Sequence, residues 1–485
     1  MSETMKRNAG HTWWLAGTIF CGLSLAAGLS SAQQPSAKPD PAAADDVLGE
    51  IVVTGRVQEH IPKIAVLRNF GSAYEDVIVR SVVRRDLELS GLFELIPDEK
   101  APDGDYGFED KVNLGAWQSL GAEAVVKVAA RSKGKKKIEV LGLAYFPSSG
   151  SDPVYETKLV VKKENARITA HRITDDLLGA LTGFPGGFAS RFAFSAPRSR
   201  NLRVFTVDSD GYGPTSRTDP KDTAIGPTFG PNGELYYSRS RNYSPFRVVV
   251  RTAGLDGPDE QLDLPFSGSV YSTTFSPDKT KVAFAVAENG SSHIYVGNAD
   301  GSDLTKVSRS ELATHPAFSS EGHLAWVGGA PDQSSQRIFV DGKAVSPASV
   351  SASAPTFCSN ENGTFLVYSV SVGGGRQDLV LSSPEGKGLT RLTQNQGSNF
   401  SPACSPDGRL LAFFSTRNDQ QALYVLSLKR WTTKKVVEVM GQGLRWEPLS
   451  RQELLLTGAP KTKAAISQAS LGPACGLAPA PANNP

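Results

Sequence analysis

A short phrase recurs five times between Gly226 and Gly408, and each copy has an anchor residue, a polar turn and then a short apolar strand. The copies read Phe229-Gly-Pro-Asn-Gly, Phe275-Ser-Pro-Asp, Phe318-Ser-Ser-Glu-Gly, Phe357-Cys-Ser-Asn and Cys404-Ser-Pro-Asp-Gly, and a degraded sixth lies at Trp446. Successive anchors are 46, 43, 39, 47 and 42 residues apart. This period is typical of propeller blades, because a four-stranded unit cannot bury both faces without stacking against copies of itself.

The order of signals within a unit supports this interpretation. After the turn comes a strand such as Leu410–Phe414, then a polar turn such as Arg417–Gln420, and then a third strand such as Leu423–Leu426. Asn, Asp and Gly suit these turns because they tolerate positive φ. Short strands at this spacing predict an all-β array rather than βαβ units.

The last unit is incomplete, because after Trp446 it offers only the strand Leu454–Leu456 before Ala/Pro-rich sequence begins. Upstream, Phe192–Ala196 and Leu202–Val207 look like third and fourth strands that lack a first strand. Pairing them as outer strands with the Leu454 strand would close a six-bladed ring and remove its open edges.

The extreme N-terminus has the pattern of a cleavable secretory signal. Lys6 and Arg7 precede an apolar run from Trp13 to Leu29, and the small residues Ser30-Ser31-Ala32 follow. We expect a signal peptide over residues 1–32, export from the cytoplasm, and no membrane insertion of the mature chain. The alternative is an uncleaved anchor, for which the run is at the short limit. Residues 33–47 predict a flexible linker and residues 458–485 a disordered Ala/Pro-rich tail.

Cysteine, histidine and charge exclude several classes of site. The mature chain keeps Cys358, Cys404 and Cys475, and an oxidising compartment would permit disulfides. Because first strands of neighbouring blades are usually too far apart to bridge, we expect Cys358 and Cys404 to be buried free thiols. The six histidines show no metal-ligand spacing, so no metal is expected. A formal charge of +2 gives no field for nucleic acid.

The pattern of apolar residues over 48–187 differs from that of the propeller, which we place at 188–457. Apolar residues at helical spacing predict helices over Tyr74–Leu89 and about Asn165–Leu181, with a short one near Trp117. β-branched runs predict strands between them. Helices on one side of a mixed sheet make this an α/β domain, so the fold class is a small N-terminal α/β domain followed by a six-bladed β-propeller.

The chain resembles the TolB family, the periplasmic components of the Tol-Pal envelope system. The resemblance depends on the block Arg-Arg-Asp-Leu-Glu-Leu-Ser-Gly-Leu-Phe at Arg84–Phe93, on Leu-Thr-Gly at Leu181–Gly183, and on the Phe-Ser-Pro-Asp repeats. It covers roughly residues 46 to 456. The long tail, the eroded last blade and the phrase Phe357-Cys-Ser-Asn depart from the family pattern.

The resemblance implies a non-enzymatic, cofactor-free and monomeric adaptor that supports envelope integrity and constriction during cell division. It would bind a TolA-like inner-membrane protein through an N-terminal strand and a peptidoglycan-associated lipoprotein through one mouth of the propeller. The TolA-type strand maps to Asp46, Glu50, Ile51, Val52, Val53 and Thr54. An extended β-branched peptide on a flexible tether suits strand addition. Alternatively, Glu50–Thr54 is an edge strand of its own domain, and both hold if the segment switches between docked and released states.

The mouth of the propeller is formed by the loops that lead into the six first strands, and their polar side chains suit protein recognition. The predicted partner-binding residues there are Asp222, Thr223, Ser269, Tyr271, Glu311, His315, Asn395, Asn399 and Arg445. The rival class is an enzyme or ligand-binding propeller, peptidase-related or lyase-type, with an axial pocket. The chain has no Gly-x-Ser-x-Gly motif, and only Asp222, Glu311 and His315 would suit a charged pocket. Whether a cation fills the axial channel stays open.

Overall fold

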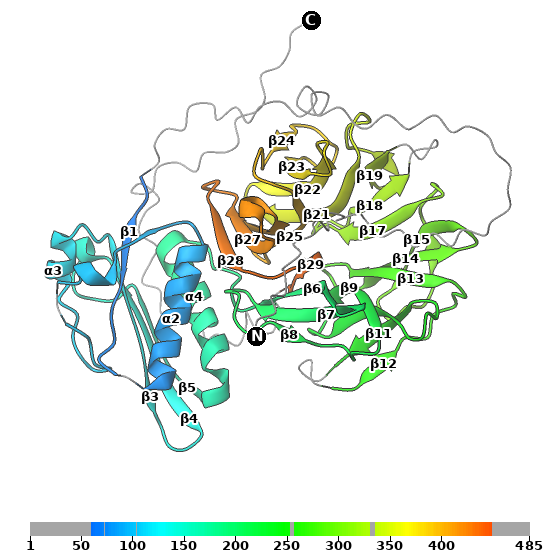
Figure 1. Cartoon of the computed structure of the whole chain (residues 1–485). Helices are drawn as coiled ribbons and strands as arrows, with labels where there is room; N and C mark the ends of the chain where they lie inside the picture. The colour runs from blue at the N-terminus through cyan, green and yellow to red at the C-terminus, as the bar shows by residue number, and fades with distance from the viewer. Residues whose placement is uncertain (1–59, 72, 103, 253–256, 330–334, 449–485) are drawn as a thin grey trace, which may run out of the picture.

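The computed structural model describes residues 60–448, apart from 72, 103, 253–256 and 330–334. An α/β domain lies beside a ring of six sheets (Figure 1). The predicted signal peptide, linker, Asp46–Thr54 segment and C-terminal tail lie outside the described residues, as does the Leu454–Leu456 strand. Within the described ranges, the chain forms no helix with the length and apolar character needed to cross a bilayer.

The α/β domain is built on one mixed sheet with the strand order β2-β1-β3-β4-β5. Strand β1 runs parallel to both β2 and β3, while β3, β4 and β5 are antiparallel. The bounds are β1 Lys63–Val66, β2 Glu94–Leu95, β3 Ala124–Ser132, β4 Lys137–Tyr145 and β5 Tyr155–Lys162.

Helices α2 (Tyr74–Leu89) and α4 (Ala166–Thr182) cover one face of this sheet, and the short α3 (Leu114–Ser119) covers the other. Alternation along β1 explains the division: Ile64 and Val66 join the core under α2 and α4. Ala65 and Leu67 instead pack with Trp117 of α3. The expectation that all helices lie on one side is therefore wrong for α3. Short 3-10 turns complete the domain at η1 Asp98–Lys100, η2 Pro147–Ser149 and η3 Lys163–Asn165.

The propeller consists of six four-stranded sheets, which we number as blades 1 to 6, and the predicted fold class is confirmed. The innermost, first strands of the blades are β9 Thr223–Phe229, β13 Ser269–Phe275, β17 Ala313–Phe318, β21 Ala352–Asn360, β25 Asn399–Cys404 and β29 Gln442–Trp446. The second strands are β10 Leu235–Ser240, β14 Lys281–Glu288, β18 Leu324–Gly329, β22 Gly363–Ser371, β26 Leu410–Ser415 and β6 Arg191–Arg198.

The two outer strands of each blade follow in the same order. The third strands are β11 Arg247–Arg251, β15 Ser291–Asn298, β19 Gln336–Val340, β23 Gln377–Ser382, β27 Ala422–Ser427 and β7 Asn201–Asp208. The fourth strands are β12 Asp259–Gln261, β16 Thr305–Lys306, β20 Lys343–Ala344, β24 Thr390–Arg391, β28 Thr433–Val437 and β8 Thr215–Ser216, with the turn η5 Arg417–Asp419 in blade 5.

Blade 6 closes the ring in a way that corrects the predicted pairing. Strand β29 pairs directly with β6, with Trp446 opposite Phe192, and β7 and β8 follow outward. The segments at 192–196 and 202–207 are thus the second and third strands of the blade, and their first-strand partner is β29. Burial explains this order, because Phe192–Ala196 is buried throughout, as the second strands of a propeller are.

Side chains reinforce the closure. The Arg191 guanidinium donates to both carboxylate oxygens of Glu447, at 2.8 and 2.6 Å. The rings of Phe192 and Trp446 lie with their centroids 4.5 Å apart, and Trp446 Nε1 donates to Ser190 Oγ at 2.7 Å. Ring closure therefore combines main-chain pairing, a bidentate ion pair and an aromatic contact.

Cys358 of β21 and Cys404 of β25 form a disulfide, so the prediction of free thiols is wrong. Both lie at the far ends of neighbouring first strands, where the Cα atoms are only 5.3 Å apart. This falls within the range that a disulfide spans. First strands crowd around the axis, and that proximity was underestimated from sequence. The bond joins blades 4 and 5 and is consistent with an oxidising compartment.

Removing this disulfide with Cys358→Ser and Cys404→Ser should lower the free energy of unfolding by about 2–4 kcal/mol, since the bond closes a loop of 46 residues. Urea denaturation with and without reductant measures this. Cys475→Ser is the control and should leave the stability unchanged. Equal stability of the double variant and the oxidised wild type would show that the bond is not formed in solution.

Candidate protein-interaction site

The two ends of the propeller differ in what covers them. The first strands begin at one end, the mouth, which also carries the turns between second and third strands. The α/β domain contacts the other end, the base: Arg85 Nη2 donates to the Lys435 carbonyl at 2.6 Å, and Arg409 Nη1 donates to the Pro185 carbonyl at 3.4 Å. Among the described residues, the α/β domain therefore leaves the mouth available to other molecules.

Every first strand contains a one-residue β-bulge, where its register against the second strand slips. The bulges lie at Gly226, Tyr271, His315, Ala354, Ser401 and Gly443, and all except Tyr271 have positive φ. At Gly226 a Cβ atom would lie 2.4 Å from the Tyr271 carbonyl oxygen, so only glycine fits. Bulges bend strands and redirect side chains. Six of them form a ring around the axis.

The sequence carries a repeated proline beside these bulges. Proline follows the bulge residue in four blades, at 227, 316, 355 and 402. Proline inside a paired strand is confined to edges and bulges because it cannot donate to the ladder. The first strand is an edge strand of each sheet, so a proline repeated at one position there fits either an edge or a bulge.

The nine predicted mouth residues all lie at or near this end, but they differ in exposure. Glu311, His315 and Asn395 are exposed, whereas Asp222 and Asn399 are buried. The remaining four are partly buried: Thr223, Ser269, Tyr271 and Arg445. Tyr271 also packs against Phe246, with ring centroids 5.5 Å apart.

Asp222 and Asn399 hold the mouth together and are not free to bind a partner. The Asp222 carboxylate accepts two hydrogen bonds from Arg241, at 2.8 and 3.0 Å. The Asn399 amide donates to Asp378 at 3.3 Å, and its carbonyl oxygen accepts from Arg417 at 3.2 Å. Both side chains thus position arginines that reach the mouth.

Several residues that sequence reasoning missed lie in the turns between second and third strands. Tyr243 is fully exposed there, with φ of 59°. Four arginines in these turns make no ion pair with any described residue: Arg198, Arg200, Arg376 and Arg417. Exposed tyrosine and arginine are the side chains most often found at interaction hot spots. The blade repeat could have located these residues, because it places the turns between second and third strands at the mouth.

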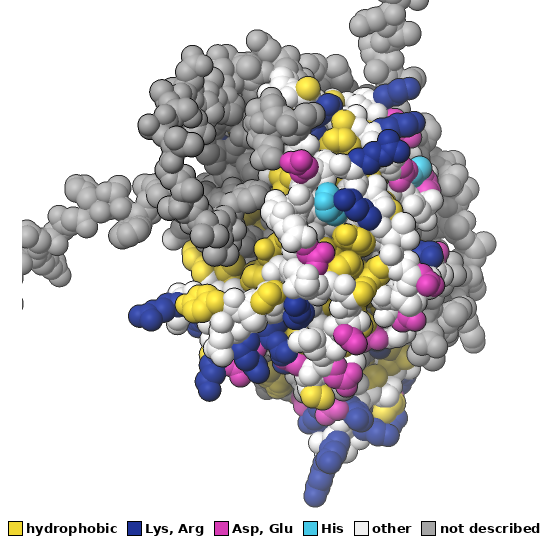
Figure 2. Space-filling view, turned by 90° about the vertical axis from the view of Figure 1, so that its right-hand side faces the viewer, with side chains coloured by type: hydrophobic (Ala, Val, Ile, Leu, Met, Phe, Trp, Pro, Cys, Tyr) yellow, Lys and Arg dark blue, Asp and Glu magenta, His cyan; other side chains and the backbone are white. Residues whose placement is uncertain are grey.

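The side of the propeller remote from the α/β domain carries basic and acidic side chains among hydrophobic ones (Figure 2). That surface is therefore mixed, without a continuous field of one sign. Mixed polar and apolar surfaces are typical of protein recognition rather than of nucleic-acid binding.

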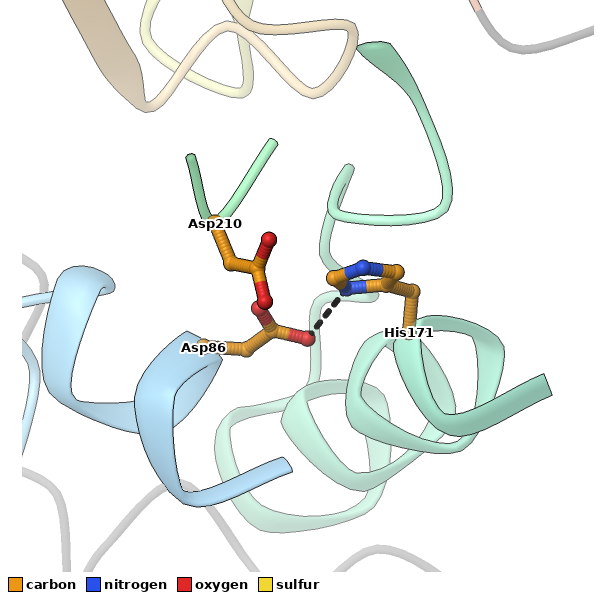
Figure 3. A group of neighbouring side chains, drawn as sticks. All are labelled: Asp86, His171 and Asp210. Atoms are coloured by element: carbon orange, nitrogen blue, oxygen red, sulfur yellow. Dashed lines mark hydrogen bonds and ion pairs between the residues drawn. The ribbon is translucent and has the colours of Figure 1, made fainter. Parts of the chain in front are cut away.

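A second cluster of charged side chains lies at the base, between the two domains. His171 of α4 shares a 2.7 Å hydrogen bond from Nδ1 with Asp86 of α2, and Asp210 approaches from the turn after β7 (Figure 3). Arg167 of α4 donates to Asp208 at 3.0 Å and to Asp210 at 2.5 Å. The cluster therefore joins the α/β domain to blade 6 through charge.

Burial shapes the ionisation of this cluster. Burial alone would lower the pKa of His171, but the carboxylates of Asp86, Asp210 and Asp208 together raise it to about 9. Burial raises the pKa of Asp86, and His171 opposes that effect. The raised pKa of His171 favours imidazolium and carboxylate at neutral pH, joined by the 2.7 Å bond.

A cavity of about 260 Å³ lies beside His171, and its lining includes Ser190, Asp208 and Glu447. Ligand atoms of Asp86, His171 and Asp210 lie within 4.8 Å of one another, so this trio is the described group that could hold a metal ion. However, Arg167 already neutralises Asp210, and His171 is bonded to Asp86. We therefore assign the cluster a structural role at the domain interface.

Comparison with known proteins agrees with this architecture. Residues 49–141 match the family model of the TolB amino-terminal domain. The Tol-Pal system protein TolB of Rickettsia prowazekii (strain Madrid E) is 27% identical over 235 residues, which cover 46% of this chain and 52% of that protein. That of Rickettsia felis (strain ATCC VR-1525 / URRWXCal2) is 27% identical over 240 residues. The chain spans about half the length of the curated relatives it matches.

The fold is also that of a solved structure. The crystal structure of TolB from Acinetobacter baumannii superposes with a TM-score of 0.66 at 18% identity, covering 81% of this chain and 98% of that one. Fold, domain order and the matched domain define a class: propeller proteins with a TolB-type amino-terminal domain. Within that class, this chain is similar to the Tol-Pal system protein TolB in its matched amino-terminal domain, in part of its sequence and in its fold.

The interface cluster predicts a pH dependence of stability. Because the folded-state pKa of His171 is about 9 and the unfolded value is 6.5, its contribution is fully present below pH 6.5 and is lost as the pH rises to about 9. His171→Gln should therefore flatten the decline in unfolding free energy between pH 6.5 and 9, by at most about 3 kcal/mol. Urea titrations at several pH values measure this. Parallel pH profiles of variant and wild type would contradict it.

Proposed function

We propose that this protein is a non-enzymatic periplasmic adaptor of a Tol-Pal system, with two binding sites. The propeller mouth binds a peptidoglycan-associated lipoprotein, and the N-terminal segment Asp46–Thr54 binds a TolA-like inner-membrane protein. Linking these partners supports envelope integrity and constriction during cell division.

The observation that carries the proposal is the opposite placement of the α/β domain and the mouth. The domain covers the base through Arg85, Arg167 and Arg409, so partners of the mouth and of the N-terminal segment need not compete for one surface. The mouth also presents Tyr243, Tyr271 and arginines without ion pairs. Such side chains supply most of the binding free energy in typical interfaces.

The second site is supported by sequence and by the family match. The match to the TolB amino-terminal domain begins at residue 49 and so includes Glu50–Thr54. Ile51, Val52 and Val53 form a β-branched core, and the Pro/Ala-rich linker before it gives reach. Strand addition draws its affinity from a row of main-chain hydrogen bonds to an exposed sheet edge.

Tyr243→Ala should weaken binding of the soluble domain of the lipoprotein by about 1–2 kcal/mol, because the ring is fully exposed at the mouth. The matched control is Tyr74→Ala, which removes a tyrosine that is 70% exposed on α2, away from the mouth. Calorimetric titration measures both, and their melting temperatures should equal that of the wild type. Tyr74→Ala should bind as the wild type does. If Tyr243→Ala and Tyr271→Ala also bind as the wild type does, the mouth is not the lipoprotein site.

Deleting residues 46–54 should abolish capture of a TolA-like partner while leaving lipoprotein binding intact. Val52→Pro should act similarly, since proline removes a donor from the pairing row. Val52→Thr is the control, because it keeps a β-branched strand former. Equal affinity of the wild type, the deletion and Val52→Pro for the TolA-like protein would remove the second site from the proposal.

A further inference from the structure

Two basic residues lie on first strands of opposite blades of the propeller. His315 lies in the bulge of β17 in blade 3, and Arg445 lies on β29 in blade 6. These blades are opposite in a six-membered ring, so first-strand side chains of the two can interact only through the axial space. The charge of Arg445 does act on His315, and His315 is exposed although it lies on an innermost strand. Solvent therefore reaches the axis at this level.

Arg445 has no counter-charge among the described residues. Its one hydrogen bond runs from Nη1 to the carbonyl oxygen of Leu444 at 3.1 Å. Burial lowers the pKa of Arg445 to about 10. The protein crowded around the axis and the charge of Arg445 both lower the pKa of His315, so the imidazole is neutral at pH 7. The axial space thus holds one uncompensated positive charge beside a neutral ring.

This arrangement favours an anion and disfavours a cation. A partly buried guanidinium without an anionic acceptor loses hydration, and a bound anion compensates for that loss. The guanidinium fork matches carboxylate and phosphate oxygens with two parallel hydrogen bonds. When Nδ1 of the neutral His315 accepts from the Thr314 hydroxyl at 3.0 Å, its Nε2–H can donate to an anion.

We propose that the axial channel of the propeller binds an anionic group of the carboxylate or phosphate class, held by Arg445 and faced by His315. The group comes either from a free anion or from an acidic side chain that a mouth-bound protein inserts. The site itself does not depend on the proposed lipoprotein partner.

The test is a titration with inorganic phosphate at constant ionic strength. Calorimetry measures binding, and the NMR ring resonances of His315 measure its pKa. We expect saturable binding and a rise in the pKa of His315 as phosphate neutralises Arg445. Arg445→Gln should weaken phosphate binding at least about tenfold, the loss expected for one charge-assisted pair. Arg445→Lys keeps the charge and should retain part of the affinity, which separates loss of charge from misfolding. Arg376→Gln, an exposed mouth arginine, is the matched control and should bind as the wild type does.

Adding the soluble domain of the lipoprotein distinguishes the two sources. If the partner displaces phosphate and binds Arg445→Gln more weakly than wild type, it supplies the anionic group. If phosphate stays bound in the complex, the ligand is a free anion. The proposal is overturned if wild type and Arg445→Gln bind phosphate equally, or if neither binds phosphate and Arg445→Gln binds the partner as wild type does.

Discussion

The pairing of β29 with β6 joins the first and last strands of the propeller. The geometry of the axial site and of the charged cluster at the base depends on it. Without this pairing, blade 6 would lack its first strand and the ring would present open edges. Arg191, Phe192 and Ser190 secure the seam from one side, and Trp446 and Glu447 from the other. The seam places Arg445 on the axis opposite blade 3. It also places the turn after β7 against α4.

The same seam fixes the α/β domain to the propeller base. The Asp175 carboxylate of α4 accepts hydrogen bonds from the main-chain N–H groups of Phe188 at 2.7 Å and Ala189 at 2.8 Å, just before β6 begins. Gly186 permits this approach, since a Cβ there would lie 2.5 Å from Asp175. The ends of the propeller therefore differ in electrostatics. Charges at the base are paired between the domains, whereas several mouth arginines make no ion pair with any described residue.

The repeat and the orphan strands predicted six blades and closure in blade 6, because each blade repeats the same local signals. The position of Phe192–Ala196 within that blade was not predictable from the repeat, since pairing order depends on burial in the closed ring. The Cys358–Cys404 bond depends on how closely the first strands of neighbouring blades approach around the axis. The spacing of the cysteines along the chain does not predict that distance. The cluster of Asp86, His171 and Asp210 comes from three distant segments without a motif. The bulge ring lies beside repeated prolines, but these fit an edge strand as well as a bulge and so did not predict it alone.

The most direct test of the account is hydrogen–deuterium exchange of the mature protein with and without the soluble domain of the peptidoglycan-associated lipoprotein. Exchange reports which main-chain amides the partner protects. The account predicts protection in the loops before the first strands and in the turns at 198–200, 241–246 and 417–419, with the base and α4 unchanged. Protection confined to the α/β domain or to the outer fourth strands would contradict the assignment of the mouth as the binding face.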